Sequence, residues 1–197
     1  MNDAAIERAL PVRLELPPPA VAVGGAALLL SRPFLAGTSS AGFLLAAGYV
    51  VLAATSLAAP AGHDRAWTTA TATTAATIAV LSLGVAAVLA SGWMTSPPPP
   101  VPTGGAAAIL LTSTAAVSEE AFFRRFLYGQ MLRYGAGVAV AGSALSFALV
   151  HLPAYGWPAF PVDLGAGLLF SWQRWASGRW SVPAATHVVA DLLAVMR

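Results

Sequence analysis

The sequence lacks cysteine and lysine, and it carries few charged residues of any kind. Without cysteine the chain has no disulfide bonds, no thiolate metal ligands and no cysteine nucleophile. Charged residues make up 9% of the 197 positions, whereas a soluble domain carries about 25%. So little charge cannot cover a water-exposed surface, and the composition therefore argues against a soluble enzyme and against a disordered chain.

Apolar residues take the place of the missing charge, at 57% of the chain and with a mean hydropathy of +0.72. The net charge of +2 comes from ten arginines and eight acidic residues spread along the sequence. No basic stripe is present that would favour a nucleic-acid partner. We therefore expect an all-α, polytopic transmembrane bundle that sits in the lipid bilayer of the cell membrane.

Two stretches without Asp, Glu, Lys or Arg, residues 33–63 and 66–118, indicate where the chain crosses the membrane. A helix needs about 20 mostly apolar residues to cross a hydrocarbon core of about 30 Å. The proline run at 97–102 divides the second stretch, because proline cannot continue a helix. The pattern predicts about seven helices. They span about residues 19–36, 42–60, 68–92, 104–133, 136–152, 160–176 and 182–196.

The same pattern predicts three parts and an orientation. Residues 1–18 form a polar arm, 19–103 the N-terminal transmembrane helices, and 104–197 a C-terminal helical core. If the N-terminus is cytoplasmic, eight of the ten arginines lie on or near the inner side, and only Arg32 and Arg197 lie outside. The positive-inside rule favours this orientation.

Ionisable residues within the predicted helices indicate the functional site, since their burial in a membrane is costly. The candidates among them are Glu119, Glu120, Arg124, His151, His187 and Asp191, whereas Asp163 is expected to cap the start of the helix over 160–176. Residues four apart share one face of a helix, so Glu120 is expected to pair with Arg124, and His187 to share a patch with Asp191. Glu119 lies about 100° around the helix from Glu120, which leaves it free for chemistry.

Estimated depths bring three of these residues together. Glu119 lies about 20 Å into a helix that enters near Gly105, at about 1.5 Å per residue. The chain turns near Tyr134, 15 residues after Glu119 and 17 before His151, so the two reach similar heights. His187 lies six residues into the last helix, or about 9 Å. Glu119, His151 and His187 are therefore expected to line one cavity.

These residues form three motifs in order on separate predicted helices: Glu-Glu-x-x-x-Arg at 119–124, Phe-x-x-x-His at 147–151 and His-x-x-x-Asp at 187–191. The set resembles the CPBP family of intramembrane endopeptidases. That family includes type II CAAX prenyl endopeptidases and bacteriocin-processing or immunity proteins. The resemblance covers about residues 104–197, and the family's last motif more often ends in Asn than in the Asp found at 191.

The resemblance implies hydrolysis of a peptide bond near the cytoplasmic face of the membrane. It implies that Glu119 is the base that activates water, with His151 orienting that water or sharing the role of base. Glu120 and Arg124 would hold the helix geometry, and His187 with Asp191 would face the developing oxyanion. The implied partner is a peptide or protein substrate, prenylated or embedded in the membrane.

A metal mechanism is the alternative for the same residues, and no cofactor is assigned. Two histidines and a carboxylate are a catalytic zinc set with one open position, and here they would be Glu119, His151 and His187. The His-Glu-x-x-His spacing of helical zinc sites is absent. The ligands would therefore come from three helices.

Two other classes of function remain open on the sequence alone. The chain is also compatible with a non-catalytic membrane scaffold or immunity protein of the same fold, in which the polar residues clamp helices together. It is compatible with a small proton-linked transporter that uses a buried carboxylate. Loss of peptide cleavage on substitution of Glu119 distinguishes the enzyme from both.

The orientation can be tested with reporter fusions. Fusions after Ala61 are expected to report a cytoplasmic location, and fusions within Ser96–Pro102 an external one, because an odd number of spans separates the two sites. The reverse result at both sites would contradict a cytoplasmic N-terminus.

Overall fold

The computed structural model describes residues 16–60, 74–91 and 105–195, and within these ranges the chain is helical and has no strand. The helices are α1 (Pro18–Ala36), α2 (Ala41–Ala58), α3 (Thr74–Ser91), α4 (Gly105–Glu120), α5 (Tyr128–Met131), α6 (Ala136–Tyr155), α7 (Phe160–Ser177) and α8 (Ser181–Val195). The segment Ala121–Leu127 is π-helical and joins α4 to α5 in one rod that ends at Tyr134. The described chain thus forms seven rods, which confirms the all-α bundle of about seven helices.

Four of these rods are long and apolar enough to cross a membrane. They are Pro18–Ala36, Ala41–Ala58, Gly105–Tyr134 and Ala136–Tyr155. Two shorter helices, Thr74–Ala90 and Ser181–Val195, are apolar as well. This set fits a multi-pass membrane protein.

Two expectations from the sequence need correction. The helix expected to end at 152 continues through Pro153 to Tyr155, so His151 lies within α6 and not at its end. The helix expected over 104–133 is α-helical only in part, because seven of its residues are π-helical. The proline run at 97–102, residues 68–73 and most of the N-terminal arm lie outside the described residues.

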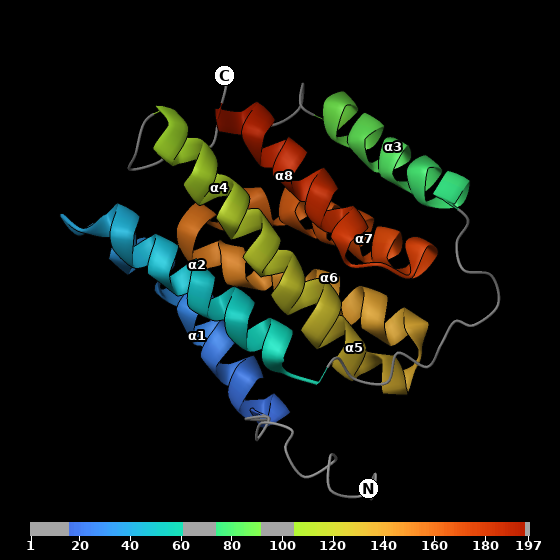
Figure 1. The fold of residues 1–197 in the computed structure, drawn as a ribbon, viewed down its shortest axis with the longest axis horizontal. Coiled ribbons are helices and arrows are strands. Elements are labelled where there is room, and N and C mark those ends of the chain that lie inside the picture. Colours follow the sequence, from blue (N-terminus) through green and yellow to red (C-terminus); the bar gives the residue numbers. More distant parts are fainter. Residues whose placement is uncertain (1–15, 61–73, 92–104, 196–197) are drawn as a thin grey trace, which may run out of the picture.

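The rod that starts with α4 lies at the centre of the bundle. Figure 1 shows α4 between α2 on one side and α8 on the other, with α3 at the edge beside α8. The N-terminal helices α1 and α2 pack against each other, and α1 also contacts α6. Residues from both halves of the chain therefore meet around α4.

An aromatic cluster fixes the middle of this central rod. The π-helical segment buries Phe122, Phe123 and Phe126 together, and their rings pack with Phe147 of α6 and Phe170 of α7 in one hydrophobic core. Phe122 and Phe123 meet edge to face at 5.0 Å between centroids, a favoured geometry for aromatic pairs. The π-helical segment that carries the three rings begins at the residue after Glu120, so this packed core lies next to the two glutamates in the sequence.

The contact between α1 and this cluster depends on a glycine. A Cβ atom at Gly25 would lie 2.2 Å from Cε2 of Phe122, whereas one at Gly24 would meet no atom within 4 Å. The Phe122 ring is buried and cannot move aside without disturbing its neighbours. Gly25 therefore permits the close approach of α1 to the central rod.

We expect Gly25→Ala to lower the free energy of unfolding by about 1–3 kcal/mol, the usual cost of overpacking a core. Thermal unfolding in detergent measures the effect. Gly24→Ala on the same helix is the matched control, and it should be neutral or stabilising because Ala favours helix over Gly by about 1 kcal/mol. Equal unfolding temperatures for the two variants would contradict the close contact between Gly25 and the ring of Phe122.

Candidate active site

A cavity of about 650 Å³ opens between α1, α2, α4, α6 and α8. Its wall is largely apolar, and its polar side chains come from all five helices. They are Arg32, Tyr49, Thr112, Glu119, His151, Tyr155, His187 and Asp191. Glu119, His151 and His187 thus line one cavity, as their estimated depths predict. Their roles in catalysis remain predictions.

Glu119 and His151 face each other across this cavity. The distance from Oε2 of Glu119 to Nε2 of His151 is 3.6 Å, and Nδ1 of His151 lies 2.6 Å from the carbonyl oxygen of Phe147. A carbonyl oxygen only accepts hydrogen bonds, so Nδ1 carries the proton and Nε2 is an acceptor in the neutral ring. Two acceptors at this separation suit a water molecule that donates one hydrogen to each.

Glu119 is not free, contrary to the expectation from the sequence. Arg32 of α1 donates from Nη1 to Oε1 of Glu119 and forms an ion pair with it. Arg32, counted above among the outer arginines, lies inside the bundle, and 11% of its side chain is exposed. The prediction failed because 87 positions separate the two residues, and only packing of α1 against the core brings them together.

Glu120 is completely buried, and one of its carboxylate oxygens contacts two other side chains. Its Oε1 accepts a hydrogen bond of 2.9 Å from Nη1 of Arg124 and lies 3.0 Å from Nδ1 of His187. The predicted ion pair between Glu120 and Arg124 is therefore confirmed. Because His187 belongs to α8, Glu120 also ties α8 to the central rod.

Arg124 is completely buried inside the bundle. Its position near the predicted inner end of the helix over 104–133 indicates instead a guanidinium near the inner interface, within reach of water. The guanidinium carbon lies 4.5 Å from the ring centroid of Phe147 and 5.3 Å from that of Phe170. Nη2 donates to the carbonyl oxygen of Gly167 at 3.2 Å. Aromatic faces and a carbonyl thus replace the expected water around the cation.

His187 and Asp191 share one face of α8, as the four-residue spacing predicts. Nε2 of His187 lies 3.6 Å from Oδ1 of Asp191, and the Asp191 side chain is one-third exposed. The imidazole packs on Phe170 with 4.8 Å between centroids. Since Nδ1 of His187 is directed at Glu120, Nε2 is the edge of the ring that faces the cavity.

Four polar residues of the cavity wall were not identified as site residues from the sequence: Arg32, Tyr49, Thr112 and Tyr155. One signal for Arg32 was available, because it is the only charged residue between positions 16 and 63. A charge in an otherwise apolar membrane helix is a functional candidate in its own right. Nothing distinguishes Tyr49 and Tyr155 from interfacial tyrosines before the helices are placed.

The residues proposed as zinc ligands do not fit a metal ion. Among the described residues, no three His, Cys, Asp or Glu side chains are grouped so that they could hold one. Oε1 of Glu119 is paired with Arg32, and Nδ1 of His187 is paired with Glu120. The arrangement instead provides a carboxylate and a histidine around a space for water.

A comparison with protein-family models finds a match over the C-terminal part of the chain. Residues 102–193 match the family described as type II CAAX prenyl endopeptidase Rce1-like. The matched part contains Glu119, His151 and His187, and it excludes α1, α2 and α3. No curated protein and no solved structure matches the chain.

We expect Arg124→Leu to destabilise the fold strongly, because it leaves the buried Glu120 without its cation. Removing one partner of a buried ion pair costs about 3–5 kcal/mol. Thermal unfolding in detergent should show a large drop in the unfolding temperature. Arg133→Leu on the exposed part of the same rod is the control and should unfold close to wild type; similar losses in both variants would contradict a special role for Arg124.

Proposed function

We propose that the protein is an intramembrane endopeptidase that cleaves a peptide bond near the cytoplasmic face, since residues 102–193 match the family described as type II CAAX prenyl endopeptidase Rce1-like. The observation that carries the proposal is the pair Glu119–His151, whose Oε2 and Nε2 atoms face each other at 3.6 Å in a cavity of about 650 Å³. Cavities of about 300–1,000 Å³ are typical of ligand-binding sites.

Glu119 acts as the general base on a water held between Oε2 and Nε2 of His151. As the water oxygen bonds to the scissile carbonyl carbon, one of its protons passes to Glu119. His151 accepts the other hydrogen and orients the oxygen, and the carbonyl of Phe147 fixes the ring in the required tautomer. A base in this position contributes about 10²–10⁴-fold to the rate.

His187 stabilises the negative charge that develops on the carbonyl oxygen. Its Nδ1 is occupied by Glu120, so Nε2 is left to donate toward the cavity when the ring carries both protons. Asp191 lies next to Nε2 and orients this edge of the ring. When the tetrahedral intermediate collapses, the proton held by Glu119 passes to the amine nitrogen and the carbon–nitrogen bond breaks.

The substrate is a peptide or protein segment that reaches the cavity from the membrane. The apolar part of the wall, from residues such as Leu45 and Leu111, suits apolar side chains or a prenylated segment. The polar groups gather around Glu119 and would meet the peptide bond. The protein would lie in the cell membrane with its N-terminus in the cytoplasm.

A non-catalytic scaffold of the same fold is the second candidate. The ion pair between Arg32 and Glu119 favours it, because a paired carboxylate is also what a structural clamp between helices uses. The two candidates differ in one respect: the scaffold needs the Glu119–Arg32 charge pair but performs no cleavage. Proteolysis therefore separates them.

Glu119→Gln is expected to abolish cleavage and leave the fold intact, since the amide keeps the shape of the side chain and cannot act as a base. The measurement is a comparison of peptide termini in membranes that carry wild-type or variant protein at equal expression. Termini present only with the wild type identify the substrate.

Glu15→Gln provides the matched control, because it makes the same chemical change in the polar arm that the sequence predicts over residues 1–18. This variant should give the wild-type set of termini. Full cleavage by Glu119→Gln would contradict the proposed mechanism, and identical termini for wild-type and empty membranes would favour the scaffold.

A further inference from the structure

We infer that Arg32 is a positioning residue of this active site: its guanidinium keeps Glu119 ionised and turned toward His151. The inference has a kinetic and a structural part. The effect of Arg32 on the rate rests on the proposed function, whereas its effect on the charge and direction of Glu119 rests on the ion pair alone. Arg32 belongs to α1, outside the residues that match the family. A helix that the family match does not cover would thus supply a group that the catalytic base needs.

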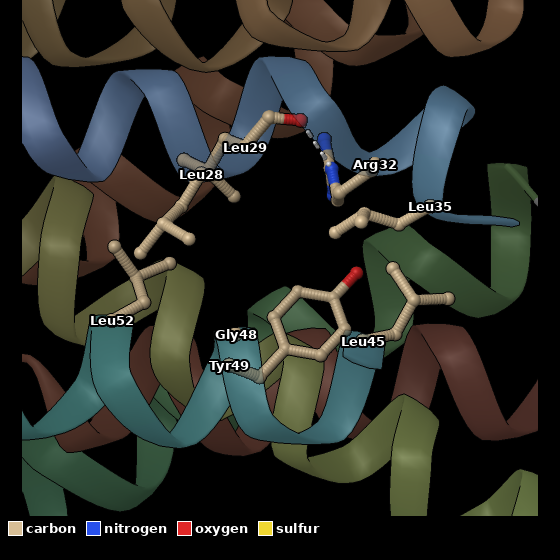
Figure 2. Close-up of a pocket in the computed structure, with 8 residues that line it drawn as sticks. All are labelled: Leu28, Leu29, Arg32, Leu35, Leu45, Gly48, Tyr49 and Leu52. Carbon is tan, nitrogen blue, oxygen red and sulfur yellow. Dashed lines mark hydrogen bonds between the residues drawn. The ribbon is translucent and has the colours of Figure 1, made fainter. Parts of the chain in front are cut away.

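Arg32 is held in place by its own helix. Its Nε donates to the carbonyl oxygen of Leu29 at 2.9 Å, the bond drawn as a dashed line in Figure 2. The guanidinium is a planar, rigid group, so fixing Nε also fixes the direction of the two terminal nitrogens. Nη1 is the nitrogen that pairs with Glu119. Arg32 is thus held at two points, by the carbonyl oxygen of Leu29 in α1 and by the carboxylate of Glu119 in α4.

Besides Glu119, the surroundings of Arg32 offer its charge the side chain of Tyr49 as a polar neighbour. On one side lies a small cleft between α1 and α2 with a mostly apolar wall (Figure 2). Its leucines are Leu28, Leu29, Leu35, Leu45 and Leu52. On the other side lies the cavity of the candidate site. In the described part of the chain, Glu119 is the only carboxylate within ion-pair distance of Arg32, and Nη2 is buried without a hydrogen-bond partner.

Glu119 depends on Arg32 in return. Only 3% of Glu119 is exposed, and an unpaired buried carboxylate takes up a proton to avoid the cost of burying its charge. A protonated Glu119 cannot accept a proton from water. The pairing of Oε1 with Arg32 also restricts rotation of the carboxylate, so that Oε2 is the oxygen directed at His151.

The other ionisable groups around the cavity cannot replace Arg32. They are Tyr49 of α2, His151 and Tyr155 of α6, and His187 and Asp191 of α8. Neither tyrosine nor aspartate carries a positive charge. His151 is the partner that holds the water, and His187 is paired with Glu120. Among the residues that line the cavity, Arg32 is therefore the only side chain with a permanent positive charge.

The structural part can be tested without a substrate, on purified full-length protein in detergent. Infrared difference spectra between a protein and its Glu119→Gln derivative isolate the signal of Glu119. With Arg32 present, the spectrum should show an ionised carboxylate at neutral pH. In the Arg32→Met background the carboxylate band should be lost and the carbonyl band of a protonated acid should replace it.

The kinetic part uses the substrate identified from the peptide termini. Arg32→Met is expected to lower kcat by about 100-fold, the typical cost of a misplaced catalytic group, with KM nearly unchanged. Arg32→Lys should recover part of kcat, because it restores the charge but cannot hold Leu29 and Glu119 at once. Added guanidinium ion should partly rescue Arg32→Ala. A merely structural role predicts neither recovery.

Ser31→Ala is the matched control, since Ser31 precedes Arg32 on α1, bonds only to the carbonyl of Leu28 and does not line the cavity. It should retain wild-type kcat and the carboxylate band. If Arg32→Met does not fold, Arg32→Gln takes its place in the infrared comparison. If neither neutral variant folds, Arg32→Lys decides the positioning role: kcat should fall because lysine cannot hold Leu29 and Glu119 at once, and a wild-type kcat in it overturns that role.

The inference and the proposed function fail in different ways. An ionised Glu119 in the folded neutral variant, or a kcat equal to or above wild type, would overturn the role of Arg32. A fully active Glu119→Gln protein would overturn the proposed function but leave the infrared result to decide whether Arg32 keeps Glu119 ionised.

Discussion

Charge buried in an apolar bundle has to be paired, and this constraint organises the whole site. Two adjacent glutamates lie almost fully buried on the central rod. Each meets a different arginine: Glu119 pairs with Arg32 from α1, and Glu120 pairs with Arg124 one turn further along. Because a buried unpaired charge is costly, the helices that provide these partners are held in fixed positions relative to α4.

The two pairs differ in what surrounds them. The Glu120–Arg124 pair is sealed, with aromatic rings around the cation and His187 as a further partner of the carboxylate. The Glu119–Arg32 pair borders the cavity and leaves Oε2 facing His151. The sealed pair therefore suits a structural role, and the pair at the cavity suits chemistry. Neighbouring residues of one type thus differ in function through their surroundings alone.

The π-helical segment after Glu120 links the core to the site. It buries three phenylalanines within five positions, and their rings pack against α1, α6 and α7. Such segments are rare and occur frequently at functional sites. Here the segment begins at the residue after the two glutamates and includes Arg124. The aromatic packing of the bundle is therefore adjacent in sequence to both carboxylates and includes the cation that pairs with Glu120.

The sequence determined every property that depends on local composition. Apolar stretches and proline positions predicted seven helices with ends close to those observed, because membrane helices need a nearly fixed number of apolar residues. Four-residue spacing predicted that Glu120 meets Arg124 and that His187 lies beside Asp191, since such pairs share a helix face. The estimated depths of Glu119, His151 and His187 along three separate helices were enough to predict that these residues line one cavity.

Tertiary structure alone decided which side chains meet between helices. The pairing of Arg32 with Glu119 joins residues 87 positions apart, and no local pattern encodes the rotation of α1 about its axis. The burial of Arg124 likewise depends on phenylalanines from three rods, whose rings surround its guanidinium. Local spacing determines on which face of its helix a residue lies and how far along the helix it lies. Its partner across the bundle is determined by how whole helices pack. The electrostatic surroundings of Glu119 follow from that packing.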